Sequence, residues 1–484
     1  MLRAKPHHNS VLIMLAFVLS GCQHLPTYDQ KSSVDLEHPY NIQVRTDEET
    51  PSSQLPVNVG WWELYADEEL NTLMRQAFAK NPNINQIRAR LNQANALAKQ
   101  NRSSRLPSLN IAGARSTFEG DNNPSSDYAL ISTASFELDL WGKNKANHAA
   151  AKLNAQASTE DLHTAHITLS ASIVENWLDI LSLLEQETLI RKQIKVNRTV
   201  LELQQKRFEM GSSSALSVLQ QEEILAQSEA NLPDILSAEK QALNNLTLLV
   251  GHTPYKGLII SEKTSPAALP IPLTGLPSDL LENRPDIIAA WLRLRSAQWA
   301  TKAAWANRLP NFDLSATYTT SATALNSLFN TWLLDLAASV AAPVFDGGNR
   351  KAEQFRQKAI ADERYHAYRE TVLNAVVEVE NALIRNIYQD QKITALNNQL
   401  LASDKTLKQA QLSYTNGSSD YVNVLNSLNN TQSLVQQITR EHLKQAKERV
   451  SLYRALGGRS WAANLPIEQN DSNSKTIVKD VKDD

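Results

Sequence analysis

The sequence has few residues that could form covalent or metal cross-links, and it has no excess of positive charge. Cys22 is the one cysteine in 484 residues, which excludes an intramolecular disulfide and a thiolate metal cluster. The formal net charge is −3, so the chain lacks the basic surface that a nucleic-acid partner requires. Loops that cradle phosphates, nucleophile elbows and paired-carboxylate sites are not recognisable either. We therefore expect no catalytic residues, no metal, no cofactor and no nucleic-acid partner.

Long apolar runs are also absent, since none reaches the roughly 20 residues of a membrane-spanning helix. The longest run, residues 11–19, follows a short basic start and leads into Gly21 and Cys22. This order is typical of a bacterial lipoprotein signal. It predicts a signal peptide over residues 1–21, cleavage between Gly21 and Cys22, and acyl chains on Cys22. An ordinary signal peptide with an incidental cysteine is the alternative.

Glycine and proline are missing from two long stretches, residues 143–208 and 349–416. Helices of this length would be roughly 100 Å long. Apolar residues recur every seven positions in both stretches, a spacing that indicates coiled-coil packing. The first series is Ile173, Ile180, Ile194, Leu201 and Phe208, with Glu187 as the exception, and the second is Val379, Ile393, Leu400, Leu407 and Tyr414, with Asn386 as the exception.

The two stretches belong to an internal repeat. Pro82 and Arg105–Pro107 recur 203 residues later as Pro285 and Arg308–Pro310, while Gly211 and Gly251 recur 206 residues later as Gly417 and Gly457. A fixed offset of this kind indicates that one structural unit occurs twice. Each copy begins with a helix that has a proline in its first turn. Alternating apolar and polar residues then predict two strands, which are followed by the long helix, a small polar turn and a return helix. Pro233 predicts a kink in the first return helix.

Strands of this kind have the length that crosses an outer membrane as part of a tilted barrel. Four strands cannot close a barrel, and open edges are not tolerated in lipid. The chain would therefore have to oligomerise, and three copies would supply twelve strands. Polar helix faces would line a wet lumen, an arrangement suited to passage and not to reaction. The alternative is a four-stranded sheet in a soluble coiled-coil protein.

Two turns and two histidines are further candidate features. Gly211 and Gly417 are expected to relieve the steric penalty of positive φ at the turns that end the long helices. His163 and His166 lie near Glu160 and Asp161. Two histidines rarely suffice for a metal site, so we interpret them as part of a solvated helix face.

At three places the residues resemble the TolC-like outer-membrane factors, specifically the NodT-type lipoprotein branch that works with resistance-nodulation-division (RND) pumps. Trp61 and Trp62, followed by Asp67 and Leu70, look like the N-terminal signature of that branch. The segment Leu280–Ile287 with Ala289 and Ala290 is similar to its most specific motif, which includes Arg284, Pro285 and Asp286. The segment Ala342–Gly348, which includes Pro343, Asp346, Gly347 and Gly348, resembles the link between the last strand and the second long helix.

The resemblance implies a mostly α-helical protein with a membrane β part. Three copies would form a homotrimer, with a 12-stranded outer-membrane barrel continued by a periplasmic helical barrel. Partners would be a periplasmic adaptor (membrane fusion) protein, an inner-membrane RND-type transporter and outer-membrane lipid. The chain would be a lipid-anchored channel subunit of an efflux pump that conducts drugs or toxic small molecules passively and binds no nucleotide. Most of its mass would lie in the periplasm.

The repeat and the resemblance together predict a division of the chain. The expected segments are a signal peptide (1–21), an anchor with an N-terminal wrap and a first equatorial helix (22–80), the first repeat (81–251), an equatorial linker (252–283), the second repeat (284–457) and a C-terminal equatorial segment with a mobile tail (458–484). Strands are expected at about 105–117, 128–140, 309–320 and 332–344, long helices at about 143–208 and 349–416, and return helices at about 215–250 and 421–456.

The second turn departs from the family pattern. Many members have acidic residues just beyond it, where this chain has Asn423 and Asn426. Tyr414 and Asp420, with Gly211 and Gly417, complete the expected periplasmic tip and gate region. For Asp420, a solvated turn carboxylate is an equal alternative.

Other functions are open on the same residues. A duct for metal-ion efflux or for type I protein secretion would use the same fold. Four methionines without a histidine or cysteine cluster weigh against the metal route, and the lipid anchor weighs against the secretion branch. A periplasmic structural coiled coil would need no strands in lipid. A lipoprotein hydrolase would need catalytic residues in a pattern that the sequence does not have.

Overall fold

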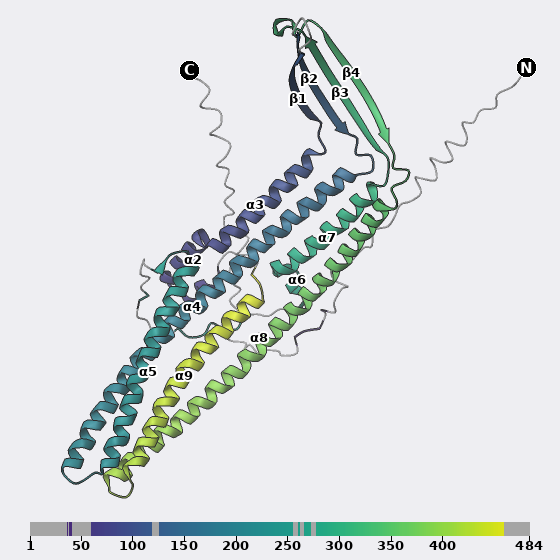
Figure 1. Cartoon of the computed structure of the whole chain (residues 1–484). Helices are drawn as coiled ribbons and strands as arrows, with labels where there is room; N and C mark the ends of the chain where they lie inside the picture. Colours follow the sequence, from purple (N-terminus) through teal and green to yellow (C-terminus); the bar gives the residue numbers. More distant parts are fainter. Residues whose placement is uncertain are drawn as a thin grey trace, which may run out of the picture. The chain divides into compact units, whose positions relative to one another are not determined.

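A computed structural model describes residues 36, 38–40, 60–118, 125–254, 260–261, 266–272 and 277–458. Long helices dominate these residues, and four strands form one sheet (Figure 1). The elements are η1 (Trp61–Tyr65), α2 (Glu68–Lys80), α3 (Pro82–Ser103), β1 (Ser108–Phe118), β2 (Ser125–Glu137), α4 (Lys143–Glu209), α5 (Ala215–Leu249), η3 (Pro277–Asp279), α6 (Leu280–Asn283), α7 (Pro285–Ala306), β3 (Asn311–Ala322), η4 (Leu325–Ser327), β4 (Trp332–Ala341), α8 (Asn349–Thr415) and α9 (Tyr421–Ala455).

Apart from the short η4 between β3 and β4, the order of elements is the same in the two halves of the chain. The matching long helices each have 67 residues. The helices lie within one or two residues of the expected bounds. α5 runs without interruption through Pro233. Both α3 and α7 begin at a proline, Pro82 and Pro285, because the first residue of a helix has no intrahelical use for its N–H group.

The strand ends differ from the expected ones, for reasons of hydrogen bonding. β1 starts at Ser108 and β3 at Asn311 because a proline without an N–H group, Pro107 or Pro310, precedes each strand. β2 ends at Glu137 and does not reach residue 140. Asp139 instead uses its carboxylate to accept hydrogen bonds from the amides of Asn144 and Lys145 at 3.0 and 2.7 Å. Leu138 still donates its amide to the Phe312 carbonyl of β3 at 2.8 Å, so the ladder ends there and Asp139 caps the start of α4.

The strands pair in the order β1-β2-β3-β4, and all three pairs are antiparallel. β2 belongs to the first repeat and β3 to the second, so the sheet joins the two copies along their central strands. Tyr128 lies opposite Ala322, and Phe136 lies opposite Leu314. Within the described residues β1 and β4 each have a strand partner on one side only, which leaves the sheet with two open edges.

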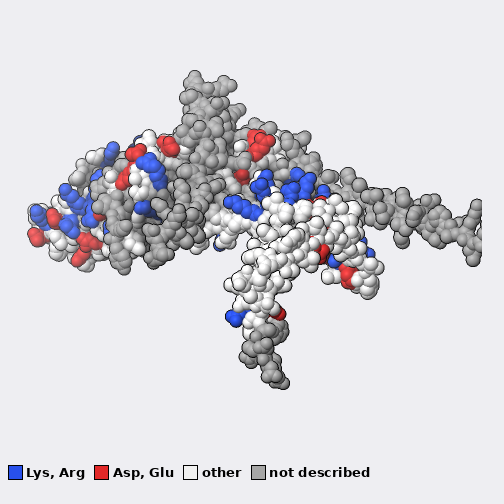
Figure 2. Space-filling view, turned by 90° about the horizontal axis from the view of Figure 1, so that it is seen from above, with Lys and Arg blue, Asp and Glu red and all other residues white. Residues whose placement is uncertain are grey.

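One face of the sheet is apolar and the other is polar, as alternation along a strand dictates. The register places Phe136, Leu314 and Ala338 in one row of the apolar face. Asp313 and Ser315 lie on the polar face. All ten residues of β4 are exposed, so the chain by itself covers neither face of this edge strand. The sheet is the pale projection in Figure 2, where charged side chains are sparse compared with the helices.

The described residues divide into two compact units. The first contains the sheet and comprises Asn95–Ala155 and Ala290–Arg369, and the second comprises Leu36–Ala94, Gln156–Ala289 and Glu370 onward. Each unit takes part of both repeats. In the first unit, Trp141 donates its ring N–H to the Pro310 carbonyl at 2.6 Å. Trp291 packs against Tyr368 with ring centroids 5.3 Å apart.

The core of the second unit surrounds the middle of α4. Trp177 and Ile180 are almost fully buried there, and Trp61 stacks on Tyr453 of α9 at 5.5 Å. Each such side chain contributes roughly 1.5–3 kcal/mol when it leaves water. The most apolar stretch of α4 is long enough to cross a membrane by composition alone, but 61% of it is buried inside this chain. Its apolar character is therefore explained by the core.

The seven-residue series is buried near this core and becomes exposed toward the hairpin tips. Ile173, Ile180 and Val379 are almost fully buried, whereas Phe208 is 48% exposed. Asn386, the exception in the second series, is also fully buried. Its amide donates to the carbonyl oxygens of Ala382 and Glu448 at 2.8 and 3.0 Å, so a hydrogen bond between α8 and α9 takes the place of an apolar contact.

The repeat is visible in single contacts of the second unit. The amide of Asn81 donates to the Leu249 carbonyl at 2.8 Å, and Arg284, 203 residues later, donates to the Ala455 carbonyl at the same distance. A Cβ atom on Gly251 would lie 2.6 Å from the Lys80 carbonyl oxygen, and one on Gly457 would lie 2.6 Å from that of Asn283. Both glycines are therefore required by close backbone contacts as well as by positive φ.

Candidate functional site

The long helices α4 and α8 end in the same kind of turn. Gly211 and Gly417 have φ values of 77° and 72°. The amide of Ser212 donates to the Arg207 carbonyl at 2.7 Å, and that of Ser418 donates to the Ser413 carbonyl at 2.9 Å. Apart from the glycine and its chain neighbours, no heavy atom of the described residues would lie within 4 Å of a Cβ atom on either glycine. The left-handed backbone, and not a lack of space, therefore requires glycine at both tips.

Tyr414 lies where the two hairpins meet at their tips. The guanidinium carbon of Arg207, on α4, is 4.7 Å from the centre of the Tyr414 ring. The ring centroid of Tyr421, on α9, is 5.5 Å from that of Tyr414. A cation above a tyrosine ring contributes about 0.5–1 kcal/mol at exposed sites. Of the expected gate residues, Tyr414 is the one that links both hairpins.

The other expected gate residues lie on the surface of the second tip. Asp420, Asn423 and Asn426 are all exposed. Asp420 occupies the N-cap position of α9 but its side chain forms no capping hydrogen bond. The Asn423 amide donates to the Ser419 hydroxyl at 2.8 Å. These three side chains are available to whatever surrounds the tip.

A line of buried polar side chains lies behind the tips, and the sequence interpretation did not include it. The Tyr421 hydroxyl donates to Oε1 of Gln221 at 2.7 Å, and the Gln221 amide donates to the Asn197 carbonyl at 2.9 Å. The Asn197 amide donates to Ser228 at 2.8 Å, and the Gln432 amide donates to Oδ1 of Asn197 at 3.3 Å. Burial, with Tyr414 nearby, holds the pKa of Tyr421 well above its ordinary value, so its hydroxyl stays a neutral donor.

A signal for this line was present in the sequence. Asn197 and Gln204 are seven residues apart on α4, and Gln221 and Ser228 are seven apart on α5; all four are buried. A polar series at the coiled-coil spacing indicates hydrogen bonds between packed helices as readily as it indicates a wet surface. Here the polar series is buried by the other hairpin, so it forms hydrogen bonds between helices and not a wet surface.

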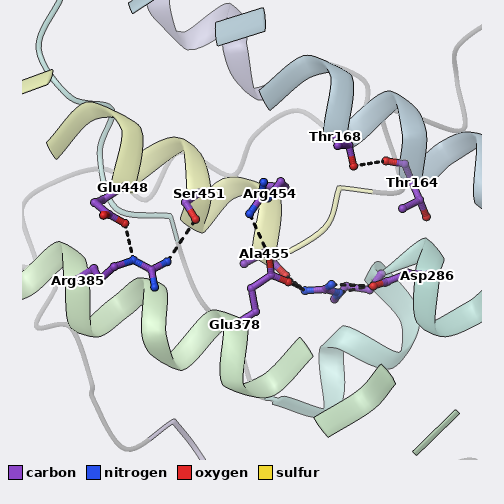
Figure 3. Close-up of polar contacts among 10 residues, drawn as sticks. Thr164, Thr168, Asp286, Glu378, Arg385, Glu448, Ser451, Arg454 and Ala455 are labelled. Carbon is purple, nitrogen blue, oxygen red and sulfur yellow. Dashed lines mark hydrogen bonds and ion pairs between the residues drawn. The ribbon is translucent and has the colours of Figure 1, made fainter. Parts of the chain in front are cut away.

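Arg284 organises a charged junction where α7 begins. Its guanidinium pairs with Asp286 at 2.7 Å and with Glu378 of α8 at 2.8 Å. Burial by itself would lower the pKa of Arg284, but the hydrogen bonds and charges of Asp286 and Glu378 raise it. Arg454 of α9 reaches the other oxygen of Glu378 at 3.4 Å. Figure 3 shows Glu378 and Arg454 facing each other beside Ala455.

A pocket of about 240 Å³ opens at this junction. Thr164 and Thr168 of α4 line it from the first repeat, opposite Arg284 and Arg454. Thr168 donates its hydroxyl to the Thr164 carbonyl at 2.9 Å, so this group is occupied within its own helix. In the first repeat, Asn81 replaces Arg284 and the matching contact is neutral. A charged side chain thus forms this contact in the second repeat, and a neutral amide forms it in the first.

The remaining motif residues have structural positions. Trp61 and Trp62 lie in the core of the second unit, and Asp67 caps α2 by accepting from the Leu70 amide at 3.0 Å. Asp346 accepts from the amides of Gly348 and Arg350 at 3.0 and 3.2 Å, which starts α8. The φ values of Gly347 and Gly348 are 63° and 88°, and Pro343 follows the end of β4.

The interpretation of the histidines as a solvated face was wrong. His163 and His166 are 4% and 2% exposed. The Nδ1 atom of His163 lies 3.1 Å from the carboxylate of Glu160. The His166 ring packs against Phe78 of α2 at 5.2 Å, and burial lowers its pKa to about 4. The reason is tertiary, because α2 covers a stretch of α4 that is more than eighty residues away in the sequence.

The predicted lipidation and cleavage positions, Cys22 and Gly21, lie outside the described residues. The same holds for the expected C-terminal tail beyond residue 458. Both stay predictions.

The fold is that of an outer-membrane channel protomer. The outer-membrane channel OprN superposes with a TM-score of 0.80 at 24% identity, over 90% of this chain and 99% of that one. Among characterised proteins, the pyoverdine export outer membrane protein OpmQ of Pseudomonas aeruginosa is 29% identical over 425 residues, 84% of this chain and 88% of OpmQ. The cation efflux system protein CusC of Escherichia coli K12 is 24% identical over 452 residues, 92% of this chain and 98% of CusC.

The family model for outer membrane efflux proteins matches residues 73–252 and 276–458, which span both repeats. The chain belongs to the outer membrane efflux protein family. Its place is the outer membrane of the cell, and the resemblance seen in the motif residues is confirmed.

Proposed function

We propose that three copies of this chain form one channel through the outer membrane, with β4 of each copy pairing with β1 of the next. The open edges of the four-stranded sheet carry this proposal. A closed barrel is the arrangement that satisfies every backbone group of a sheet in lipid. Twelve strands give an even number within the range of outer-membrane barrels.

Exposed apolar side chains beside β4 support the assembly. Val344 and Phe345, which follow β4, are 96% and 91% exposed in the single chain. Two adjacent residues of this kind, next to an open strand edge, fit a contact with a second copy. The apolar face of the sheet then meets lipid, and its polar face, with Ser315, Thr317 and Thr319, lines the passage.

The channel works in a tripartite efflux pump, with a periplasmic adaptor protein and an inner-membrane RND-type transporter as its partners. The hairpin tips form its periplasmic mouth, where Tyr414 and Arg207 hold the two hairpins together and Asp420, Asn423 and Asn426 face the surroundings. The chain itself provides a path and no catalysis, because the transporter supplies the energy.

The charge of the mouth depends on positions 420, 423 and 426. Asp420 provides one carboxylate per chain, whereas Asn423 and Asn426 provide none. Asn426→Asp should therefore raise cation preference, measured as the reversal potential in a salt gradient; an unchanged potential would refute this role of the position.

The cargo in this proposal is a small organic molecule. OpmQ, named for export of pyoverdine, is 29% identical to this chain, whereas CusC, named for cation efflux, is 24% identical. Cation efflux stays a second candidate because CusC matches over nearly its whole length. Restoring export of an organic dye in cells that lack their own channel, without restoring tolerance to metal cations, would distinguish the two.

The N-terminus is anchored by acyl chains on Cys22. Several acyl chains hold firmly because each buried methylene contributes about 0.8 kcal/mol. Radiolabelled palmitate should enter the wild-type protein and not Cys22→Ser; labelling that persists in the variant would exclude this site.

The central experiment measures the mass of the full-length protein in detergent and its conductance in planar lipid bilayers. We expect the mass of three chains and discrete conductance steps. A monomer without conductance would overturn the proposal.

A further inference from the structure

The apolar face of the sheet has a single charged side chain in the described strands, that of Arg115. The residues on this face are Leu109, Ile111, Gly113, Arg115 and Thr117 of β1, Ser126, Tyr128, Leu130, Ser132, Ala134 and Phe136 of β2, Phe312, Leu314, Ala316, Tyr318, Thr320 and Ala322 of β3, and Trp332, Leu334, Leu336, Ala338 and Val340 of β4. The carboxylates of the same strands, Asp127, Glu137, Asp313 and Asp335, all lie on the opposite face. Arg115 therefore has no acidic neighbour on its own face of the described strands.

The register places Arg115 at one end of the apolar band. Trp332 shares a row with Thr320, Leu130 and Gly113, and Arg115 lies two residues beyond that row. Val340 and Trp332 are eight positions apart on β4, which corresponds to about 27 Å along the strand. With the tilt of an outer-membrane strand, this band is about 20 Å high, close to the hydrocarbon thickness that such barrels match. Arg115 thus lies just past the hydrocarbon, at the level of lipid headgroups.

That end of the band faces the cell exterior. β1 follows α3 and β2 leads into α4, so the helices adjoin the Ser108 and Glu137 end of the β1–β2 hairpin. Arg115 and Tyr128 face each other near the other end. Since the helices of an outer-membrane efflux protein extend into the periplasm, Arg115 belongs to the outer leaflet side.

Within the described residues, the contacts of Arg115 are with neutral groups. Its guanidinium carbon is 5.5 Å from the centre of the Tyr128 ring, and one Nη atom is 3.5 Å from the Ser126 hydroxyl. Neither contact is with an anion. Arginine in the middle of the lipid-facing band costs about 2–4 kcal/mol, and near the interface the cost falls to about 0–1 kcal/mol. An aromatic ring beside an interfacial cation is also the usual composition of the girdle at that level.

We infer that Arg115 binds a phosphate group of an anionic lipid in the outer leaflet, with Tyr128 orienting the guanidinium from beside it. A guanidinium presents paired N–H donors that match two phosphate oxygens. Trimer symmetry gives three such sites around the barrel. This inference rests on the proposed barrel, because it needs the apolar face of the sheet to meet lipid.

The test uses purified full-length trimer in vesicles of phosphatidylcholine that contain lipid A as the phosphorylated probe. Lipid retained by the protein after gentle detergent extraction is counted by native mass spectrometry. The variants are Arg115→Gln, Arg115→Lys and Arg90→Gln, where Arg90 is an exposed arginine of α3 outside the strands. Parallel vesicles contain lipid A from which the phosphates have been removed, and a further sample contains free inorganic phosphate as competitor.

Wild-type protein and Arg90→Gln should retain phosphorylated lipid A equally. Arg115→Gln should lower its apparent affinity about fivefold at low salt, the effect expected of one arginine near an anionic surface, and Arg115→Lys should retain part of it. Lipid A without phosphates should be retained poorly by every variant, and free phosphate should not displace the lipid.

Equal retention by Arg115→Gln and wild type would overturn the inference, as would retention that does not depend on the lipid phosphates. Displacement by inorganic phosphate would overturn the lipid as the ligand. Each sample is also checked for trimer mass and conductance. If the trimer and its conductance are intact while retention is unchanged, the phosphate site alone fails; if they are absent in wild type, the proposed channel fails.

Discussion

At the scale of single residues, the burial of His166 makes the stability of the protein depend on pH. His166 is packed against Phe78, and among the described residues neither of its ring nitrogens has a hydrogen-bond partner. Burial, and to a smaller extent His163 and Arg88, lower its pKa to about 4 from an ordinary value of 6.5. A histidine held neutral in the fold binds its proton more readily in the unfolded chain. Stability therefore falls as the pH drops from 6.5 towards 4.

We expect the helical part of the protein to lose about 2 kcal/mol of unfolding free energy between pH 7.5 and pH 5 on account of His166. His166→Phe keeps a ring against Phe78 and removes the titration, so its stability should change less over the same range. Denaturant unfolding followed by helical circular dichroism at the two pH values measures this. His442→Gln, at an exposed position of α9, is the control. Identical pH dependence in His166→Phe and wild type would contradict the prediction.

At the scale of elements, the two hairpins are joined near their tips by hydrogen bonds in addition to apolar packing. Tyr421 packs with Val424 and Leu425 in a small apolar cluster, while its hydroxyl reaches Gln221 of the other hairpin. The Gln221 amide in turn donates a hydrogen bond to the Asn197 carbonyl. Because these groups are buried, an unmatched partner costs more than the bond contributes when formed.

Tyr421→Phe should destabilise the tip by about 1–2 kcal/mol, since Oε1 of Gln221 then lacks its donor. Gln221→Leu should cost a similar amount, and the double variant should cost less than the sum, because both ends of the same bond are gone. Amide hydrogen exchange in the first turns of α9 measures the local change. Tyr388→Phe, at a position that is 62% exposed, should leave exchange unaltered. Strict additivity of the two substitutions would show that the bond does not couple the hairpins.

Much of the element pattern could be predicted from spacing alone. The absence of glycine and proline identified α4 and α8, and the offset identified the repeat, because both depend on local backbone preferences. Asn386 and the two histidines could not be placed in this way. Whether a polar side chain on a helix is wet or buried depends on which distant segment covers it, and α2 and α9 supply that cover here.

At the scale of the whole molecule, the single chain leaves strand edges and apolar side chains exposed that a trimer would cover. Among the strands that the structure describes, β1 and β4 each have one unpaired edge, and Val344 and Phe345 next to β4 are almost fully exposed. Two neighbouring apolar side chains in water are unfavourable. Their burial against a second copy would contribute roughly 1.5–3 kcal/mol each.

Phe345→Asp should weaken the trimer at least about tenfold, because it removes this burial and places a charge in the contact. The secondary structure of the chain should be retained, since Phe345 is 91% exposed in the single chain. Light scattering of the detergent-solubilised protein over a dilution series measures the change, and Phe345→Tyr, which keeps the ring, serves as the control. A trimer of undiminished stability in Phe345→Asp would remove this residue from the interface.

The sequence by itself determined the duplication, the two very long helices, the alternating strands and the glycine turns at Gly211 and Gly417, since each follows from local backbone chemistry or from periodicity. It also determined that four strands could not enclose a path. Only the tertiary structure decided that β2 and β3 join the repeats, that Asp139 leaves its strand to cap α4, and that Asn386, His163 and His166 are buried. These outcomes depend on which surfaces meet, and contacts between residues far apart in the chain are not written in the spacing of near neighbours.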